Sequence, residues 1–167
     1  MPHKGKRAQT QLNMEKLGVI LIKGSVTITD PCYEPRIWCA AVMNVLPGQW
    51  VCQAEKVSDT CVKTLRICKP GCEKKVKPDE RWCTVSVDSG KCGFFDTETY
   101  EKIYASQDKA YAWYKETNRI ALDKACGLMS DSFGVVSVSY NGNGVFPVYV
   151  GRDAHSDIVV IEIRFIG

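Results

Sequence analysis

The residues best suited to chemistry in this chain are its nine cysteines, whose thiols bind metals or act as nucleophiles once they ionise. The N-terminal stretch is basic and polar with no apolar segment typical of a secretory signal, so we expect a reducing compartment. There the cysteines are expected to pack as small buried hydrophobes. Only Cys68 and Cys72 form a close pair, and a structural zinc site usually needs two such pairs. Zinc stays an alternative, while the prediction is that the chain holds no metal and no cofactor.

Groups for acid–base work are few. Histidine occurs only at His3 and His155, so a nucleophile activated by histidine would have to rely on His155. Asp30, Asp88 and Asp96 each end or follow an expected strand, and three carboxylates at one edge of a sheet could hold a divalent metal. The simpler interpretation makes the first two turn residues and the third a helix cap. We therefore predict no catalytic residues and no enzyme, with a metal-dependent hydrolase or phosphodiesterase as one alternative.

A basic stretch is the remaining chemical feature. Its members are Lys63, Arg66, Lys69, Lys74, Lys75 and Lys77, and the aromatic residues that could accompany them are Tyr33, Trp38, Trp50, Trp82 and Tyr140. Cations that contact phosphate, together with rings that stack on bases, are what a protein needs to hold a nucleotide or a single strand. The alternative is a solvated lysine loop beside buried aromatic residues. A net charge of +3 is too small to predict binding to long nucleic acid.

Glycine-rich motifs for phosphate are absent from the sequence. The segment Asn141-Gly142-Asn143-Gly144 contains two glycines but no following helix whose N-terminus would hold a phosphate. Its residues readily adopt positive φ, so the pattern predicts a hairpin that joins strands over 135–140 and 145–150.

The elements expected to position these residues are strands at both ends of the chain and helices in the middle. We predict strands in 17–30 around a turn at Lys23-Gly24, a pair over 49–57 and 61–67, and an alternating strand over 82–88. Residues 40–46 could be a strand or a helical turn. Asp96 is expected to cap a helix to Tyr104, and Ser106 a helix to about Lys124, with Gly127 just beyond its end.

Apolar residues alternate over 159–165, and this alternation predicts a strand with one buried face. The fold class is therefore α+β: mainly antiparallel β-sheet, sandwich or half-barrel-like, with one or two helices inserted in the middle of the chain. We expect a flexible basic tail over 1–15 and a single domain over 16–167. No apolar run is long enough to cross a bilayer, so we expect no membrane partner and a cytoplasmic location.

Three blocks of sequence carry a resemblance to a known family. They are Asp30-Pro31-Cys32-Tyr33, the segment from Val85 to Asp96, and the segment from Gly134 to Val150 that continues with Ile158 to Phe165. Together they resemble a family of small bacterial and bacteriophage proteins of unknown function. The resemblance covers Gly24 to Phe165, with Cys61 to Arg81 unmatched. Asn143 and Phe146 stand where the family has an aspartate and a tyrosine, so neither of those groups is expected to be essential here.

The resemblance implies a fold and a phage-linked setting, so that a phage-encoded protein would act in the host cytoplasm. Our hypothesis is a non-enzymatic protein, forming a homo-oligomer, that sequesters a small anionic ligand such as a cyclic oligonucleotide used as a host defence signal. The expected ligand contacts border the shared loops: Tyr33, Trp38, Asp88, Ser89, Lys91 and Arg152. A protein–protein interaction module, such as an inhibitor or immunity factor, is the main alternative and predicts a large exposed apolar patch.

Overall fold

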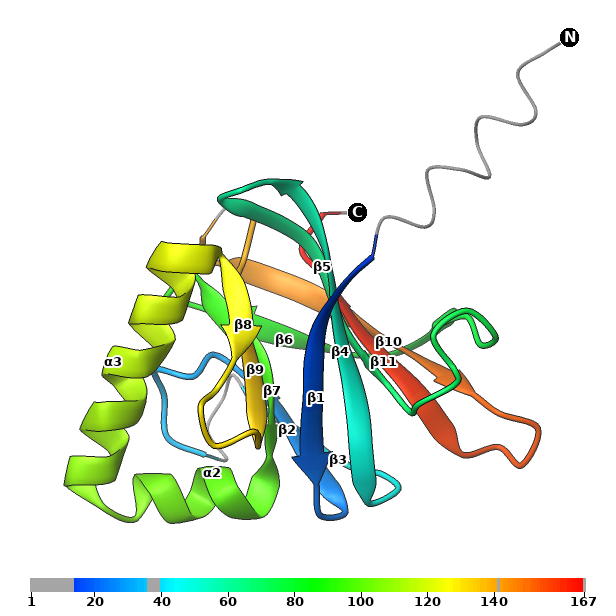
Figure 1. Cartoon of the computed structure of the whole chain (residues 1–167), viewed down its shortest axis with the longest axis horizontal. Coiled ribbons are helices and arrows are strands. Elements are labelled where there is room, and N and C mark those ends of the chain that lie inside the picture. The colour runs from blue at the N-terminus through cyan, green and yellow to red at the C-terminus, as the bar shows by residue number, and fades with distance from the viewer. Residues whose placement is uncertain (1–13, 36–39, 141, 167) are drawn as a thin grey trace, which may run out of the picture.

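The chain forms two antiparallel β-sheets that face each other, as seen in a computed structural model that describes residues 14–35, 40–140 and 142–166 (Figure 1). The six-stranded sheet contains, in spatial order, β1 (Glu15–Ile22), β4 (Gly48–Ser58), β5 (Cys61–Cys68), β11 (Ile158–Arg164), β10 (Gly144–Arg152) and β6 (Glu80–Val87). The five-stranded sheet contains β3 (Ala41–Asn44), β2 (Ser25–Thr29), β7 (Lys91–Asp96), β9 (Gly134–Val138) and β8 (Cys126–Leu128). The predicted α+β, sandwich-like fold is confirmed.

The main core lies between the two sheets and follows from alternation along each strand. Trp50, Cys52 and Ala54 of β4 are fully buried and point to the same side, where they belong to one cluster with Ile28 and Phe94 of the other sheet. A fully buried isoleucine or phenylalanine side chain contributes about 1.5–3 kcal/mol relative to an exposed one. The core therefore joins the two sheets into one unit.

Two helices in the described part of the chain cover the outer face of the five-stranded sheet (Figure 1). Helix α2 (Thr97–Tyr104) begins after Asp96, whose carboxylate accepts from the Thr99 backbone N–H at 3.1 Å, and α3 (Gln107–Lys124) begins after Ser106. A second apolar cluster fills the space beneath them: Phe95, Tyr100, Trp113, Ile120, Met129 and Val136. Both predicted caps are confirmed. No helix among the described residues has the length and apolar character to cross a membrane.

The predicted role of Gly127 as the residue just beyond the end of α3 is wrong. The helix is followed by Ala125, which adopts φ 67° although it is not glycine, and its carbonyl accepts from the Val138 N–H at 2.8 Å. Gly127 already belongs to β8, where an added Cβ would lie 3.2 Å from Ile120 of the helix. The glycine allows close packing of strand on helix, a role that a sequence pattern does not distinguish from a cap.

The predicted hairpin over 135–150 is also wrong, because β9 and β10 belong to different sheets. The connection crosses the sandwich, and its Ser139 N–H donates to the Gly90 carbonyl at 2.9 Å. Glycines permit positive φ whatever the strands on either side pair with, so the motif predicts a turn but not a partner. Asn141 lies outside the described residues.

The last strand, β11, is buried on both faces, not on one as predicted. Ile161 and Ile163 face the main core, while Val160 and Glu162 on the other face are 1% and 4% exposed. The cover on the outer face is the loop over 69–79, whose Val76 and Cys72 pack on this sheet. The ambiguous segment 40–46 contains the strand β3.

Candidate functional site

The first two blocks singled out in the sequence meet at a buried carboxylate. Asp30 follows β2 and is fully buried. Its two oxygens accept from the Cys32 N–H at 3.0 Å, the Asp88 N–H at 2.9 Å, the Ser89 N–H at 2.7 Å and the Ser89 hydroxyl at 2.6 Å. A buried carboxylate with this many donors is well compensated for its lost hydration. Asp30 therefore fastens the β6–β7 turn to the end of β2.

The third block reaches the same place through side chains. The exposed Asp88 carboxylate accepts from the Tyr33 hydroxyl and, at 3.4 Å, from the Asn143 amide. We call the group of Asp30, Tyr33, Asp88, Ser89 and Asn143 the Asp30 cluster. These hydrogen bonds run between its own members or to neighbouring backbone, and the two pockets described below lie elsewhere. The cluster is built as a fastening between loops.

Helix α2 closes the cluster from the side. The Tyr100 hydroxyl donates to the Tyr33 carbonyl and the Tyr104 hydroxyl to the Pro31 carbonyl, each at 2.5 Å. Burial raises the pKa of Tyr104 to about 12, which keeps the phenol protonated and able to donate. The proline-containing loop is thus held by the helix as well as by Asp30.

The five predicted contacts that the structure describes do not form a single site. Tyr33, Asp88 and Ser89 lie together, Lys91 is 9% exposed in β7 in register with Val138, and Trp38 lies outside the described residues. Arg152 ends β10, whose other end, Gly144, adjoins the Asp30 cluster. With nine residues at about 3.3 Å each, the strand separates these ends by roughly 26 Å.

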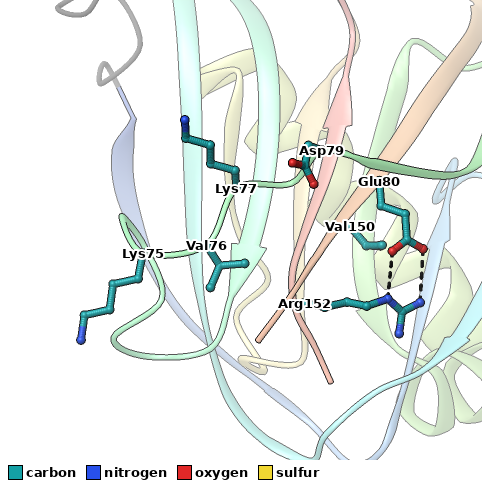
Figure 2. A pocket seen from close by; sticks show the side chains of 7 residues that line it. All are labelled: Lys75, Val76, Lys77, Asp79, Glu80, Val150 and Arg152. Carbon is teal, nitrogen blue, oxygen red and sulfur yellow. Dashed lines mark hydrogen bonds and ion pairs between the residues drawn. The ribbon is translucent and has the colours of Figure 1, made fainter. Parts of the chain in front are cut away.

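Arg152 instead lies between two adjoining pockets at the opposite end of the sandwich, which together we call the Arg152 groove. The first pocket has a volume of about 330 Å³ and the second of about 290 Å³. The first is lined by Lys75, Val76, Lys77, Asp79, Glu80, Val150 and Arg152 (Figure 2). The second is lined by Asn44, Val45, Leu46, Arg152, Ser156, Asp157 and Ile158. Each volume is of the order of a small-ligand site.

Arg152 is held at the centre of the groove by two acceptors. Its guanidinium donates to both carboxylate oxygens of Glu80, at 2.9 and 3.3 Å (Figure 2). It also donates to the Ser156 carbonyl at 3.0 Å. The hydrogen bond from Arg152 lowers the pKa of Glu80 and, in return, raises that of Arg152. Both side chains stay partly exposed, at 40% and 47%. The pair is therefore accessible to a ligand.

The lysine-bearing wall of the groove is placed by a glycine in β10. At Gly151 an added Cβ would lie 2.7 Å from the Lys77 carbonyl and 2.8 Å from Val76. Only glycine allows the loop to cross β10 this closely. Val76 then packs against the outer face of the sheet, while Lys75 and Lys77 extend away from it (Figure 2).

A charged stack on the outer sheet face holds the same loop from its other end. Glu162 is 4% exposed and bridges two arginines, accepting from Arg66 at 2.5 and 2.8 Å and from Arg164 at 2.6 Å. Arg164 also donates to the Pro78 carbonyl at 2.6 Å and lies 3.7 Å from the ring centre of Tyr149. Burial of a carboxylate is costly unless its charge is paired, and here two guanidinium groups compensate it. The loop is therefore anchored next to Glu80.

The second pocket lies between two turns that are themselves fixed. In the β10–β11 turn, the Asp153 carboxylate accepts from the N–H groups of His155 at 2.9 Å and Asp157 at 3.1 Å. In the β3–β4 connection, the Leu46 carbonyl accepts from the Trp50 indole at 3.0 Å. Both walls of the pocket are thus held in place by contacts within the chain itself.

The thiols and carboxylates do not gather into a metal site. No group of three or more histidine, cysteine or acidic side chains placed to hold a metal occurs in the chain as described. Burial raises the pKa of Cys68 to about 12, so this thiol is a poor metal ligand at neutral pH. Asp96 caps α2 and accepts from the Lys23 N–H at 2.8 Å, away from Asp30 at the far end of β2.

The comparisons add no relative to these observations: no family model, no curated protein and no solved structure matches the chain. The groove residues that sequence reasoning missed are Glu80, Asn44 and Asp157. The glycine and polar residues over 151–157 are a turn signal that could have placed Asp157 beside Arg152, whereas Glu80 and Asn44 have no such signal. That the turn faces the lysine loop could not be read from the sequence, because the contact depends on sheet order.

Proposed function

We propose that this protein is a non-enzymatic binding protein that sequesters a small phosphorylated ligand in the Arg152 groove. The observation that carries the proposal is the position of Arg152, which is partly exposed between two pockets, the first of which is also lined by Lys75 and Lys77. Guanidinium groups bind phosphate through two parallel hydrogen bonds, and nearby ammonium groups add charge attraction.

The bond between Arg152 and Glu80 supports this assignment. The Glu80 carboxylate presents two oxygens to the guanidinium, at 2.9 and 3.3 Å, in the way that a phosphate group would. A ligand that carries two or more negative charges on its phosphates competes for the guanidinium better than a single carboxylate does. Glu80 thus keeps Arg152 oriented until a ligand binds and favours strongly anionic ligands over weak ones.

The lining of the groove supports binding without conversion. Its described residues include no histidine and no cysteine, and a nucleophile needs an activating base within hydrogen-bond reach. The resemblance to small bacteriophage proteins favours cyclic oligonucleotides, acting as host defence signals, as the ligands to test. A protein that removes a signal by mass action must hold it unchanged, and assembly into homo-oligomers would multiply its sites.

The test is isothermal titration calorimetry of the full chain with inorganic pyrophosphate and a panel of cyclic di- and trinucleotides. We expect micromolar or tighter binding of at least one nucleotide, and release of that nucleotide chemically intact on heating. Arg152→Ala is expected to weaken binding about ten-fold or more, since a charge-assisted hydrogen bond is lost. Glu80→Gln is expected to strengthen it, because a neutral amide competes less for Arg152.

The matched control is Arg119→Ala, which removes the same charge from the exposed surface of α3. Equal losses with Arg152→Ala and Arg119→Ala would show that only net charge matters and would contradict the groove as the site. Absence of binding to every phosphate compound at micromolar protein would end the proposal. Native mass spectrometry of the same samples would show the size of the assembly.

A second candidate is a protein–protein interaction module, and the outer face of α3 favours it. Tyr111 and Leu122 are 62% and 85% exposed there, more than apolar groups usually are on a helix that packs on a sheet. For this function, Tyr111→Ser with Leu122→Ser should abolish association in sedimentation experiments, while Arg152→Ala should leave it unchanged.

A further inference from the structure

We infer that the second pocket of the Arg152 groove is a base-binding site selective for guanine, so that the sequestered ligand is a guanine nucleotide. The inference rests on the proposed function, because it takes Arg152 as the group that binds phosphate. It adds the chemical identity of the ligand, which the phosphate contacts alone do not specify.

The first step is the continuity of the two pockets. Arg152 lines both of them, so a phosphate bound to its guanidinium lies at the boundary. Toward the lysine loop the lining contains Lys75 and Lys77 beside the acidic Asp79 and Glu80, and the two ammonium groups are available to further phosphate groups. On the other side of Arg152, the second pocket has a volume of about 290 Å³ and is left for the remainder of the ligand.

The second step is the apolar part of the second pocket. Val45, Leu46 and Ile158 contribute apolar surface, and Leu46 is 37% exposed although its carbonyl is tied to the Trp50 indole. The Val45 N–H donates to the Gly24 carbonyl at 3.0 Å, which holds the wall in place. Aliphatic side chains on a fixed wall can cover the flat face of a purine and remove apolar surface from water.

The third step is the polar part, which decides between bases. Asp157 lines this pocket from the β10–β11 turn and Asn44 lines it from the end of β3. The backbone of Asp157 is fixed by Asp153 on both sides, at 2.9 and 3.1 Å. Its carboxylate receives no hydrogen bond from any residue of the described chain, so its acceptor capacity is open to a ligand.

Guanine is the base that matches a carboxylate. Its N1–H and N2–H₂ groups point along one edge and donate to the two oxygens together, while O6 can accept from an amide such as that of Asn44. Adenine presents an unprotonated N1 at the corresponding position, whose lone pair would face the carboxylate without a proton between them. A site built for hydrogen bonds rejects a base that leaves them unmade.

The test measures binding of GMP, IMP and AMP to the full chain by calorimetry, with inorganic pyrophosphate as a probe of the phosphate subsite. We expect GMP to bind about ten-fold or more tightly than AMP, with IMP between them because it lacks the 2-amino group. Asp157→Asn should reduce the preference for GMP over AMP to about two-fold or less, and pyrophosphate binding should stay within about two-fold of the parent.

Asp59→Asn is the matched control, since Asp59 lies in the exposed β4–β5 turn and should leave the preference unchanged. Circular dichroism of each variant establishes that it is folded. If pyrophosphate binds but GMP and AMP bind equally or not at all, the base site is wrong and the phosphate site stands. If neither pyrophosphate nor any nucleotide binds, the proposed function fails and the base site fails with it.

Discussion

The two ends of the sandwich use acidic side chains in opposite ways. At one end Asp30 is fully buried and accepts four hydrogen bonds from the turns around it. At the other end Glu80 is 47% exposed and bonds to a single side chain, Arg152. A buried carboxylate with several donors fixes loops in place, whereas an exposed ion pair contributes little to stability and can exchange partners.

One strand connects the end of the sandwich that stabilises the fold with the end that we propose binds the ligand. β10 begins beside the Asp30 cluster and ends at Arg152. Both ends therefore belong to the same sheet, but their polar residues have different roles. The sequence draws attention to this cluster because its residues are polar and belong to the three blocks that carry the family resemblance. In the structure those residues bond to one another and to backbone, while the groove keeps its polar groups exposed.

The largest expected effect is on the Asp30 cluster. Asp30→Asn replaces one acceptor oxygen with a donor, which leaves N–H groups of the β6–β7 turn without a partner in a buried place. We expect the free energy of unfolding, measured by urea denaturation, to fall by about 2–4 kcal/mol. Asp88→Asn, at an exposed position, should lower it by less than about 1 kcal/mol.

This variant also tests the division of tasks. At a temperature where Asp30→Asn is folded, its affinity for the ligand of the groove should match that of the parent. A large loss of affinity would show that the two ends are coupled and would break the comparison.

An intermediate effect is expected at Gly151, which belongs to the groove end. Gly151→Ala places a methyl group 2.7 Å from the Lys77 carbonyl and so pushes the lysine loop away from β10. Overpacking of this kind costs about 1–3 kcal/mol of stability, which thermal or urea unfolding would measure.

The displaced loop should also weaken pyrophosphate binding by about ten-fold, a loss comparable to that from one charge-assisted contact. Asp30→Asn differs from Gly151→Ala in this respect, because it loses stability but keeps its affinity. Unchanged affinity in Gly151→Ala would show that Lys75 and Lys77 take no part in binding.

How much of the molecule was predictable differs between the two ends. Local patterns predicted most of the strands, both helix caps and the fold class, because alternation and capping depend on neighbours in sequence. They also suggested that Asp30, Asp88 and Asp96 could meet at one edge of a sheet. The first two do meet, through the Asp88 N–H, whereas Asp96 lies at the other end of β2.

The groove was not predictable from local patterns. It needs Glu80 of β6 beside Arg152 of β10, a pairing of residues 72 positions apart. The contact between Asn143 and Asp88 likewise depends on β10 joining the sheet of β6 and not that of β9. Sheet order is set by packing across the whole chain, so neither contact leaves a signal in the neighbouring sequence.

The smallest effect is expected where the Asp30 cluster meets solvent. The Tyr33 hydroxyl donates to the Asp88 carboxylate, and Asn143 donates to the same carboxylate at 3.4 Å. Because Asp88 is exposed, water can replace either donor, and Tyr33→Phe should lower the free energy of unfolding by less than about 1 kcal/mol. Asn143→Ala is the matched variant, with an equal or smaller loss since its contact is longer. A loss of stability from Tyr33→Phe as large as that from Asp30→Asn would mean that the exposed hydrogen bond, and not the buried carboxylate, fastens the loops. The contrast between a buried, stabilising carboxylate at one end and an exposed one at the other would then be wrong.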